Sequence, residues 1–176
     1  MENVKVTPGK FGLNYGVLLG IIMVLIAVIM YVTGMMLEGK QWPQFLYYLI
    51  FPAVIIIGIK AYKAKNCGFL KLGDALKVGL VIAIISALIY VIYGIIFNYV
   101  LEPGYIDKLM SVARDKMLEN PNATEEQIEM SINIMEKMSD PIIGSSAWVG
   151  LSLFFGLIYS LVGGLVMKKD NPYEDA

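Results

Sequence analysis

The sequence predicts an all-α membrane protein: four transmembrane helices with an extracytoplasmic amphipathic helical insertion between the third and the fourth. Two observations lead to this fold class. The chain of 176 residues is 57% hydrophobic and 16% charged, whereas soluble domains are about 45–50% apolar and about 25% charged. Its apolar residues fall into four long blocks separated by charged stretches, and the mean hydropathy is +0.66. This pattern excludes a soluble globular domain, a secreted disulfide scaffold and a disordered tail.

Four spans are expected within a single membrane domain that covers residues 1–176. Their approximate bounds are 11–37, 43–61, 75–101 and 142–167. A helix rises about 1.5 Å per residue and the hydrocarbon core is about 30 Å thick, so blocks of this length are suited to crossing a membrane. Pro52 lies within the second and shortest block. It favours a kinked helix there, with a re-entrant segment as the alternative.

The basic residues are distributed unevenly between the two sides of these spans. Nine lie before the first span, between the second and third, or after the fourth, and five lie in the other two connections. Because cytoplasmic loops carry an excess of Lys and Arg, this bias predicts a multi-pass protein with both termini in the cytoplasm. The formal charge is +4 on that side and −5 on the other. The small net charge of −1 is therefore the sum of two opposite faces.

Small residues recur at every fourth position in three of the spans, on one face of each helix. They are Gly12, Gly16 and Gly20 in the first span, Gly79, Ala83 and Ala87 in the third, and Ser152, Gly156, Ser160 and Gly164 in the fourth. Such faces allow helix backbones to approach closely in a membrane. We expect them to pack against one another inside a four-helix bundle, and homodimerisation through one face is the alternative.

The residue inventory argues against an enzyme. The chain has no histidine and one cysteine, Cys67. Imidazole metal sites, haem held by an axial His, internal disulfides and Ser-His or Cys-His catalysis are therefore excluded. The span centres contain no Asp, Glu, Lys or Arg, although ionisable groups usually mark a proton or ion path. We expect no catalytic residue, cofactor or metal, and the net charge gives no indication of nucleic-acid binding.

Two features of the third span have both a structural and a functional interpretation. Asp74, at the start of this span, is the candidate functional residue of the cytoplasmic side, where it could contact a cation or a partner protein. We favour a helix start in which the carboxylate caps free N–H groups and interacts with the helix dipole. Tyr90, Tyr93 and Phe97 share one face of the span, which favours core packing over an aromatic ligand site.

Residues 102–141, between the third and fourth spans, are not membrane-like and contain nine acidic and four basic residues. Two amphipathic helices are expected, one over about 105–119 and one that begins with the capping-box pattern Thr124–Gln127. The second helix carries the candidate partner surface. Its members recur at helical spacing and are Ile128, Ile132, Met135 and Met138.

Each of these amphipathic helices must bury its apolar stripe, and three arrangements can do so. The helices can pair as a hairpin that caps the bundle, lie in the lipid interface, or offer a Met-rich groove to another protein. We rank the hairpin first and the partner surface second. The net negative charge of the segment differs from the basic pattern of helices that bind anionic membranes.

The order of these features resembles a known family. The stretch 66–79, NCGFLKLGDALKVG, is similar to the loop-to-helix signature of the bacterial membrane family called domain of unknown function 4199. The Tyr-rich third span, the Glu102-Pro103 exit, the acidic helix, Asp140-Pro141 and the Gly-rich last span ending in Lys168-Lys169 are similar too. The resemblance implies a four-helix, multi-pass protein of the bacterial inner membrane without an assigned activity, and it transfers no catalytic residues.

These observations favour a non-enzymatic accessory or interaction protein in the lipid bilayer. The outer helices would recognise a membrane or periplasmic protein, and the lysine-rich loop at 60–77 would contact a cytoplasmic partner or anionic lipid. The alternative is an oligomeric transporter or channel for small solutes or ions. The glycine faces and Pro52 favour it, and the uncharged span centres oppose it. The weakest hypothesis is a lipid enzyme that uses Asp74 or Glu102.

Overall fold

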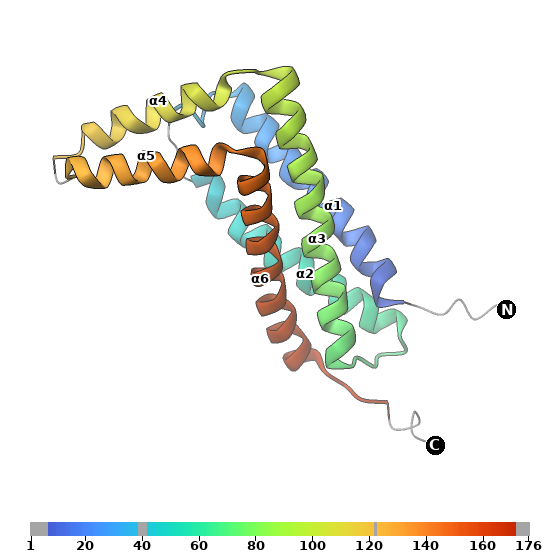
Figure 1. Cartoon of the computed structure of the whole chain (residues 1–176). Coiled ribbons are helices and arrows are strands. Elements are labelled where there is room, and N and C mark those ends of the chain that lie inside the picture. The colour runs from blue at the N-terminus through green and yellow to red at the C-terminus, as the bar shows by residue number, and fades with distance from the viewer. Residues whose placement is uncertain (1–6, 39–41, 122, 172–176) are drawn as a thin grey trace.

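The computed structural model describes residues 7–38, 42–121 and 123–171, which form an all-helical structure (Figure 1). The helices are α1 (Pro8–Val32), α2 (Trp42–Lys65), α3 (Leu72–Ile96), α4 (Tyr105–Leu118), α5 (Glu125–Ser139) and α6 (Pro141–Met167). A π-helical turn, η1 (Phe97–Leu101), extends α3. The predicted fold class is confirmed: four long apolar helices, with two shorter helices between the third and the fourth.

The four helices that are long and apolar enough to cross a membrane have clear ends. They cover Pro8–Val32, Phe45–Lys65, Leu72–Leu101 and Pro141–Met167. The first helix ends before the apolar block does, because Gly34 adopts a φ of 69° and residues 33–38 form turns. A left-handed glycine just after the last helical residues is a common helix end. Pro52 lies inside α2, which continues to Lys65.

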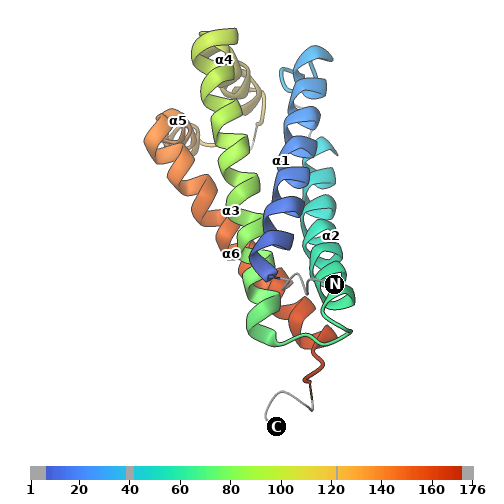
Figure 2. The same cartoon turned by 90° about the vertical axis from the view of Figure 1, so that its right-hand side faces the viewer.

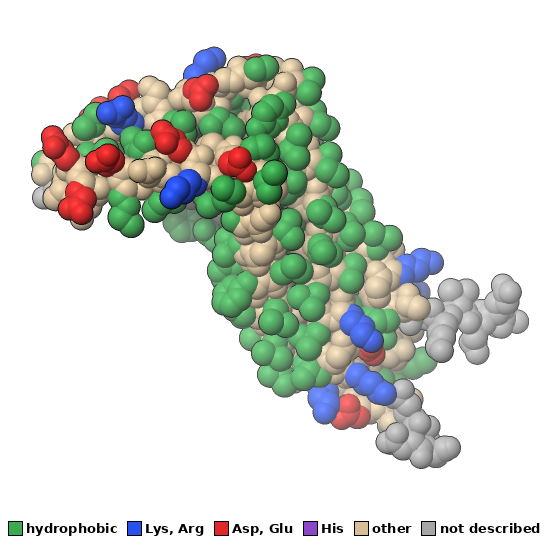
Figure 3. Space-filling model, viewed as in Figure 1, with side chains coloured by type: hydrophobic (Ala, Val, Ile, Leu, Met, Phe, Trp, Pro, Cys, Tyr) green, Lys and Arg blue, Asp and Glu red, His purple; other side chains and the backbone are tan. Residues whose placement is uncertain are grey.

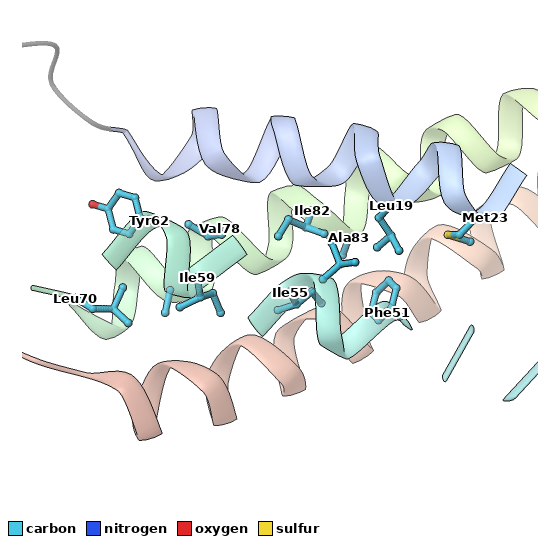
Figure 4. Close-up of a cluster of buried hydrophobic side chains, with 12 residues drawn as sticks. Leu19, Met23, Phe51, Ile55, Ile59, Tyr62, Leu70, Val78, Ile82 and Ala83 are labelled. Atoms are coloured by element: carbon cyan, nitrogen blue, oxygen red, sulfur yellow. The ribbon is translucent and has the colours of Figure 1, made fainter. Parts of the chain in front are cut away.

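The core of the bundle surrounds α3, which contacts α1, α2 and α6. Leu19, Ile55 and Ile82, from three different helices, are fully buried in this core (Figure 4). In contrast, many large apolar side chains on the outside of the spans are exposed, including Ile142 at 77% and Val166 at 81%. Four apolar helices with such an outer surface indicate a lipid-bilayer setting.

The beginning of α1 and the end of α6 lie at the same end of the bundle, away from α4 and α5 (Figure 1). A clasp joins the α2–α3 loop to the end of α6 there. Leu70 and Lys169 exchange two backbone hydrogen bonds of 2.8 and 3.0 Å. The Nζ of Lys63 also donates a hydrogen bond of 2.7 Å to the carbonyl oxygen of Met167, where a cation is favoured by the dipole of α6.

The helices α4 and α5 pair as an antiparallel hairpin that projects from the opposite end of the bundle (Figure 1, Figure 2). The predicted capping box is present, with bonds of 3.3 and 3.2 Å between Thr124 and Gln127. The carboxylate of Asp140 then accepts 2.9 Å hydrogen bonds from the N–H groups that begin α6. In these helices α5 buries no residue and α4 buries only Tyr105. The expected hairpin is thus present, but it adds little to the core of the bundle.

Candidate functional site

The small-residue faces lie at helix contacts inside the bundle. A Cβ added to Gly16 of α1 would lie 2.8 Å from the Cβ of Ile85 in α3, and one added to Gly156 of α6 would lie 2.5 Å from the Cβ of Ala83. The remaining close approaches are Gly12 to Val81, Gly20 to Ile89, Gly79 to Ser160, and Gly164 to Ala75. Ala87 and Ser152 are buried as well. Neighbouring helices of the same chain therefore occupy these faces.

A series of aromatic rings crosses the bundle at its hairpin end. The rings of Tyr90 and Tyr93 lie 6.1 Å apart, centroid to centroid, and those of Tyr93 and Phe97 lie 5.6 Å apart. Trp148 of α6 connects this face of α3 to α2, because its ring lies 5.2 Å from Tyr90 and 5.5 Å from Tyr47. The ring Nε1 of Trp148 is buried and has no partner among the described residues. The arrangement is that of packed rings, which stabilise each other by edge and offset contacts.

The base of the hairpin is attached to α1 through Tyr31. The hydroxyl of Tyr31 donates a hydrogen bond to the carboxylate of Glu102. Its ring lies 4.9 Å from Phe97 and 5.4 Å from Tyr105. Burial and the nearby Glu102 raise the pKa of the Tyr105 hydroxyl, which therefore stays protonated at neutral pH. The bond from Tyr31 to Glu102 thus joins α1 to the exit from α3.

The N-cap residue of α3 is Lys71, so Asp74 does not occupy the capping position that was expected for it. Asp74 lies half-buried in the first turn, where the helix dipole favours its negative charge. Its carboxylate accepts a 3.1 Å hydrogen bond from the hydroxyl of Tyr62 in α2. The ring of Tyr62 in turn lies 5.8 Å from that of Phe11 in α1. Asp74 therefore helps to join two helices at the basic end of the bundle. Cys67, in the same loop region, is exposed.

Two hollows open near the hairpin end, and both have mostly apolar walls. One, of about 370 Å³, occupies the corner between the hairpin and the bundle, with Tyr99, Met110, Met138 and Trp148 in its walls. The other, of about 260 Å³, lies between α1 and the start of α2, with Met23 and Tyr48 in its walls. Among the described residues, no cluster of His, Cys, Asp or Glu could hold a metal ion. The walls suit apolar contact better than acid–base chemistry.

Comparison with known proteins identifies the family. The family model described as "Protein of unknown function (DUF4199)" matches residues 14–169. The chain belongs to this family. No curated protein and no solved structure matches it. The matched range includes the residues of α4 and α5.

In this DUF4199 protein, the candidate partner surface is divided between two sides of α5. Ile128, Ile132 and Met135 are half-buried. Ile128 and Ile132 line a further hollow with Leu118 of α4, and Met135 lines the corner hollow with Met110 of α4. Met138 is 46% exposed and also lines the corner hollow. It continues a second apolar line that sequence reasoning missed, in which Met130 is 64% and Ile134 is 50% exposed. The sequence does show that Met130, Ile134 and Met138 are four residues apart, which is the spacing of one helix face.

Proposed function

We propose that this DUF4199 protein is a non-enzymatic interaction protein of the bacterial inner membrane, whose α4–α5 hairpin recognises another membrane or periplasmic protein. One observation carries the proposal: α5 buries no residue and α4 buries only Tyr105. The hairpin is nevertheless held in a defined position. Tyr31 binds Glu102 at its base, and the Nζ of Lys116 donates to the carbonyl oxygen of Glu38 further along α4. A hairpin that is held in place but adds little to the core of the bundle is well suited to present a surface to another protein.

Charge supports a recognition role for the outward side of α5. Glu129, Asn133 and Glu136 are exposed on one side of this helix. Figure 3 shows acidic side chains along the hairpin, among apolar and basic ones. Residues three and four apart on a helix face the same way. An acidic face of this kind attracts a basic partner surface and speeds its association.

Charge also supports the orientation. Lysines gather at the end of the bundle near the chain termini, far from the acidic hairpin (Figure 3). Under the positive-inside rule, this distribution favours cytoplasmic termini and an extracytoplasmic hairpin.

The recognition role predicts a site-specific crosslink. A photo-crosslinking amino acid at Asn133 should give a discrete adduct in cells, because this position lies between Glu129 and Glu136 on the exposed side of α5. Reversing both charges, with Glu129→Lys and Glu136→Lys, should remove the adduct. The same crosslinker at Val166, which is 81% exposed on α6, is the control for contacts with lipid-embedded neighbours. An adduct that persists after charge reversal, or that also forms at Val166, would refute recognition by this face.

The orientation predicts a thiol-labelling pattern. Cys67 is exposed and is the only cysteine of the chain. Because the proposed orientation places Cys67 in the cytoplasm, an impermeant maleimide added to intact spheroplasts should not label the wild-type protein. It should label a Cys67→Ser, Asn133→Cys variant. Opening the membrane with detergent should make Cys67 reactive and serves as the control. Labelling of Cys67 in intact spheroplasts, without labelling at residue 133, would reverse the orientation.

A further inference from the structure

The apolar surface of α5 is wider than its contact with α4 requires. Successive residues in a helix are rotated by about 100°, so residues four apart form a line that drifts by only about 40° per step. Ile128, Ile132 and Met135 lie toward α4. Met130, Ile134 and Met138 form the second line and are 64%, 50% and 46% exposed. We call these three residues the α5 stripe.

The α5 stripe leads into the corner between the hairpin and the bundle. Met138 forms part of the corner hollow together with Tyr90 and Ile95 of α3, Tyr99 of η1 and Trp148 of α6. Tyr90 and Trp148 lie well inside their spans, so the hollow extends from the hairpin toward the level of the membrane. Figure 1 shows the same relation, with α5 as the hairpin helix that continues directly into α6.

Exposed apolar side chains also lie at the ends of α3 and α6 that meet this corner. Ile142 and Ile143, immediately after α5, are 77% and 47% exposed at the start of α6, and Ile95 is 44% exposed on α3. These side chains belong to candidate spans, whose exposed apolar surface indicates a lipid setting. The α5 stripe extends that surface sideways. Asp140 is the one charged residue between Met138 and Ile142 in the sequence, and its carboxylate binds the first N–H groups of α6.

We propose that the α5 stripe rests on the adjacent membrane leaflet, with its side chains in the interfacial region and lipid chains in the corner hollow. Apolar area drives this contact, since the acidic hairpin gains nothing from anionic lipid. Glu129, Asn133 and Glu136 lie on a different side of α5 and remain in water. The lipid contact would thereby orient the acidic face away from the membrane. This proposal is based on the exposed apolar residues of the α5 stripe, and it does not require that the acidic face binds a protein.

Nitroxide accessibility tests this proposal on the full chain in phosphatidylcholine nanodiscs. In a Cys67→Ser background, spin labels are placed at Ile134→Cys, on the stripe, and at Asn133→Cys, the adjacent residue on the aqueous side. Collision rates are measured with oxygen, which concentrates in lipid, and with a water-soluble nickel chelate. The label at residue 134 should give the higher oxygen-to-nickel ratio, and the label at residue 133 should give the lower one.

Three further outcomes are decisive. Equal ratios at residues 133 and 134 would show that the stripe is in water and would overturn the proposal. Dipolar broadening between residue 134 labels on two chains would assign the stripe to a second copy and would also overturn it. A label at Met130→Cys must repeat the result for residue 134, which guards against a local disturbance by one substitution. The failure of protein recognition by the acidic face would leave these ratios unchanged.

Discussion

Replacing Gly79 with alanine is expected to destabilise the bundle by about 1–3 kcal/mol, the usual cost of overpacking a well-packed core. Gly79 lies on α3 where that helix meets α6, and an added Cβ would overlap the side chain of Ser160. The two backbones must separate to relieve the overlap. Thermal unfolding of the purified protein in detergent, followed by circular dichroism, should show the loss.

Two variants make this prediction specific to the α3–α6 contact. Gly94 lies on the same helix, and an added Cβ there meets nothing within 4 Å, so Gly94→Ala should leave the midpoint almost unchanged. Adding Ser160→Gly to Gly79→Ala should recover most of the stability, because it removes the atoms that clash. Equal stability of Gly79→Ala and Gly94→Ala would contradict the close packing. A variant that stays folded but loses a dimer would instead assign the face to homodimerisation.

Replacing Trp148 with alanine is expected to cost about 2 kcal/mol, less than the ~3–5 kcal/mol for a fully buried aromatic side chain, because the ring is half-buried against the core. The ring lies 5.5 Å from Tyr47 of α2 and 5.2 Å from Tyr90 of α3. Its removal would break the aromatic series and merge the two hollows whose walls it shares. The free energy of unfolding, measured by titration with sodium dodecyl sulfate in mixed micelles, tests this.

The controls for Trp148 separate the ring from its N–H group. Trp148→Phe keeps an aromatic ring and removes the Nε1, which is buried without a partner among the described residues, so it should cost much less than alanine. Phe154→Ala, at a position 57% exposed on the same helix, should have a small effect. A loss at Phe154 as large as that at Trp148 would show that the aromatic series does not stabilise the bundle.

Most of the fold follows from patterns that lie within single segments. Long apolar blocks predict spans because a bilayer core requires a fixed length of apolar helix. The Thr124–Gln127 pattern predicts a helix start because its two hydrogen bonds join residues only three apart. The apolar spacing in 105–139 likewise predicts two paired helices. The predicted first span continues to residue 37, whereas α1 ends at Val32. Hydropathy does not show that Gly34 adopts the left-handed conformation that ends the helix.

Features that join distant segments could not be predicted in this way. Periodicity shows which side of a helix is apolar, but it does not name the neighbour on that side. The bond from Tyr31 to Glu102 joins residues 71 positions apart, and neither residue belongs to a motif that predicts the other. Met130 and Ile134 of the α5 stripe are not predicted, for a related reason. The line of Ile128, Ile132 and Met135 is enough to account for the amphipathic pattern of the sequence. The second line is recognised only in the structure, where its side chains are more exposed than those of the first.

The clasp at the basic end also constrains how the protein is made. Leu70 is synthesised long before Lys169, and N-terminal segments leave the ribosome first. The hydrogen bonds between these two residues, and the bond from Lys63 to Met167, therefore have to wait for the last helix. Until then α1 and α3 can already pack together, while the face of α3 around Gly79 stays open to lipid. Membrane insertion should thus pass through a three-helix intermediate that α6 completes.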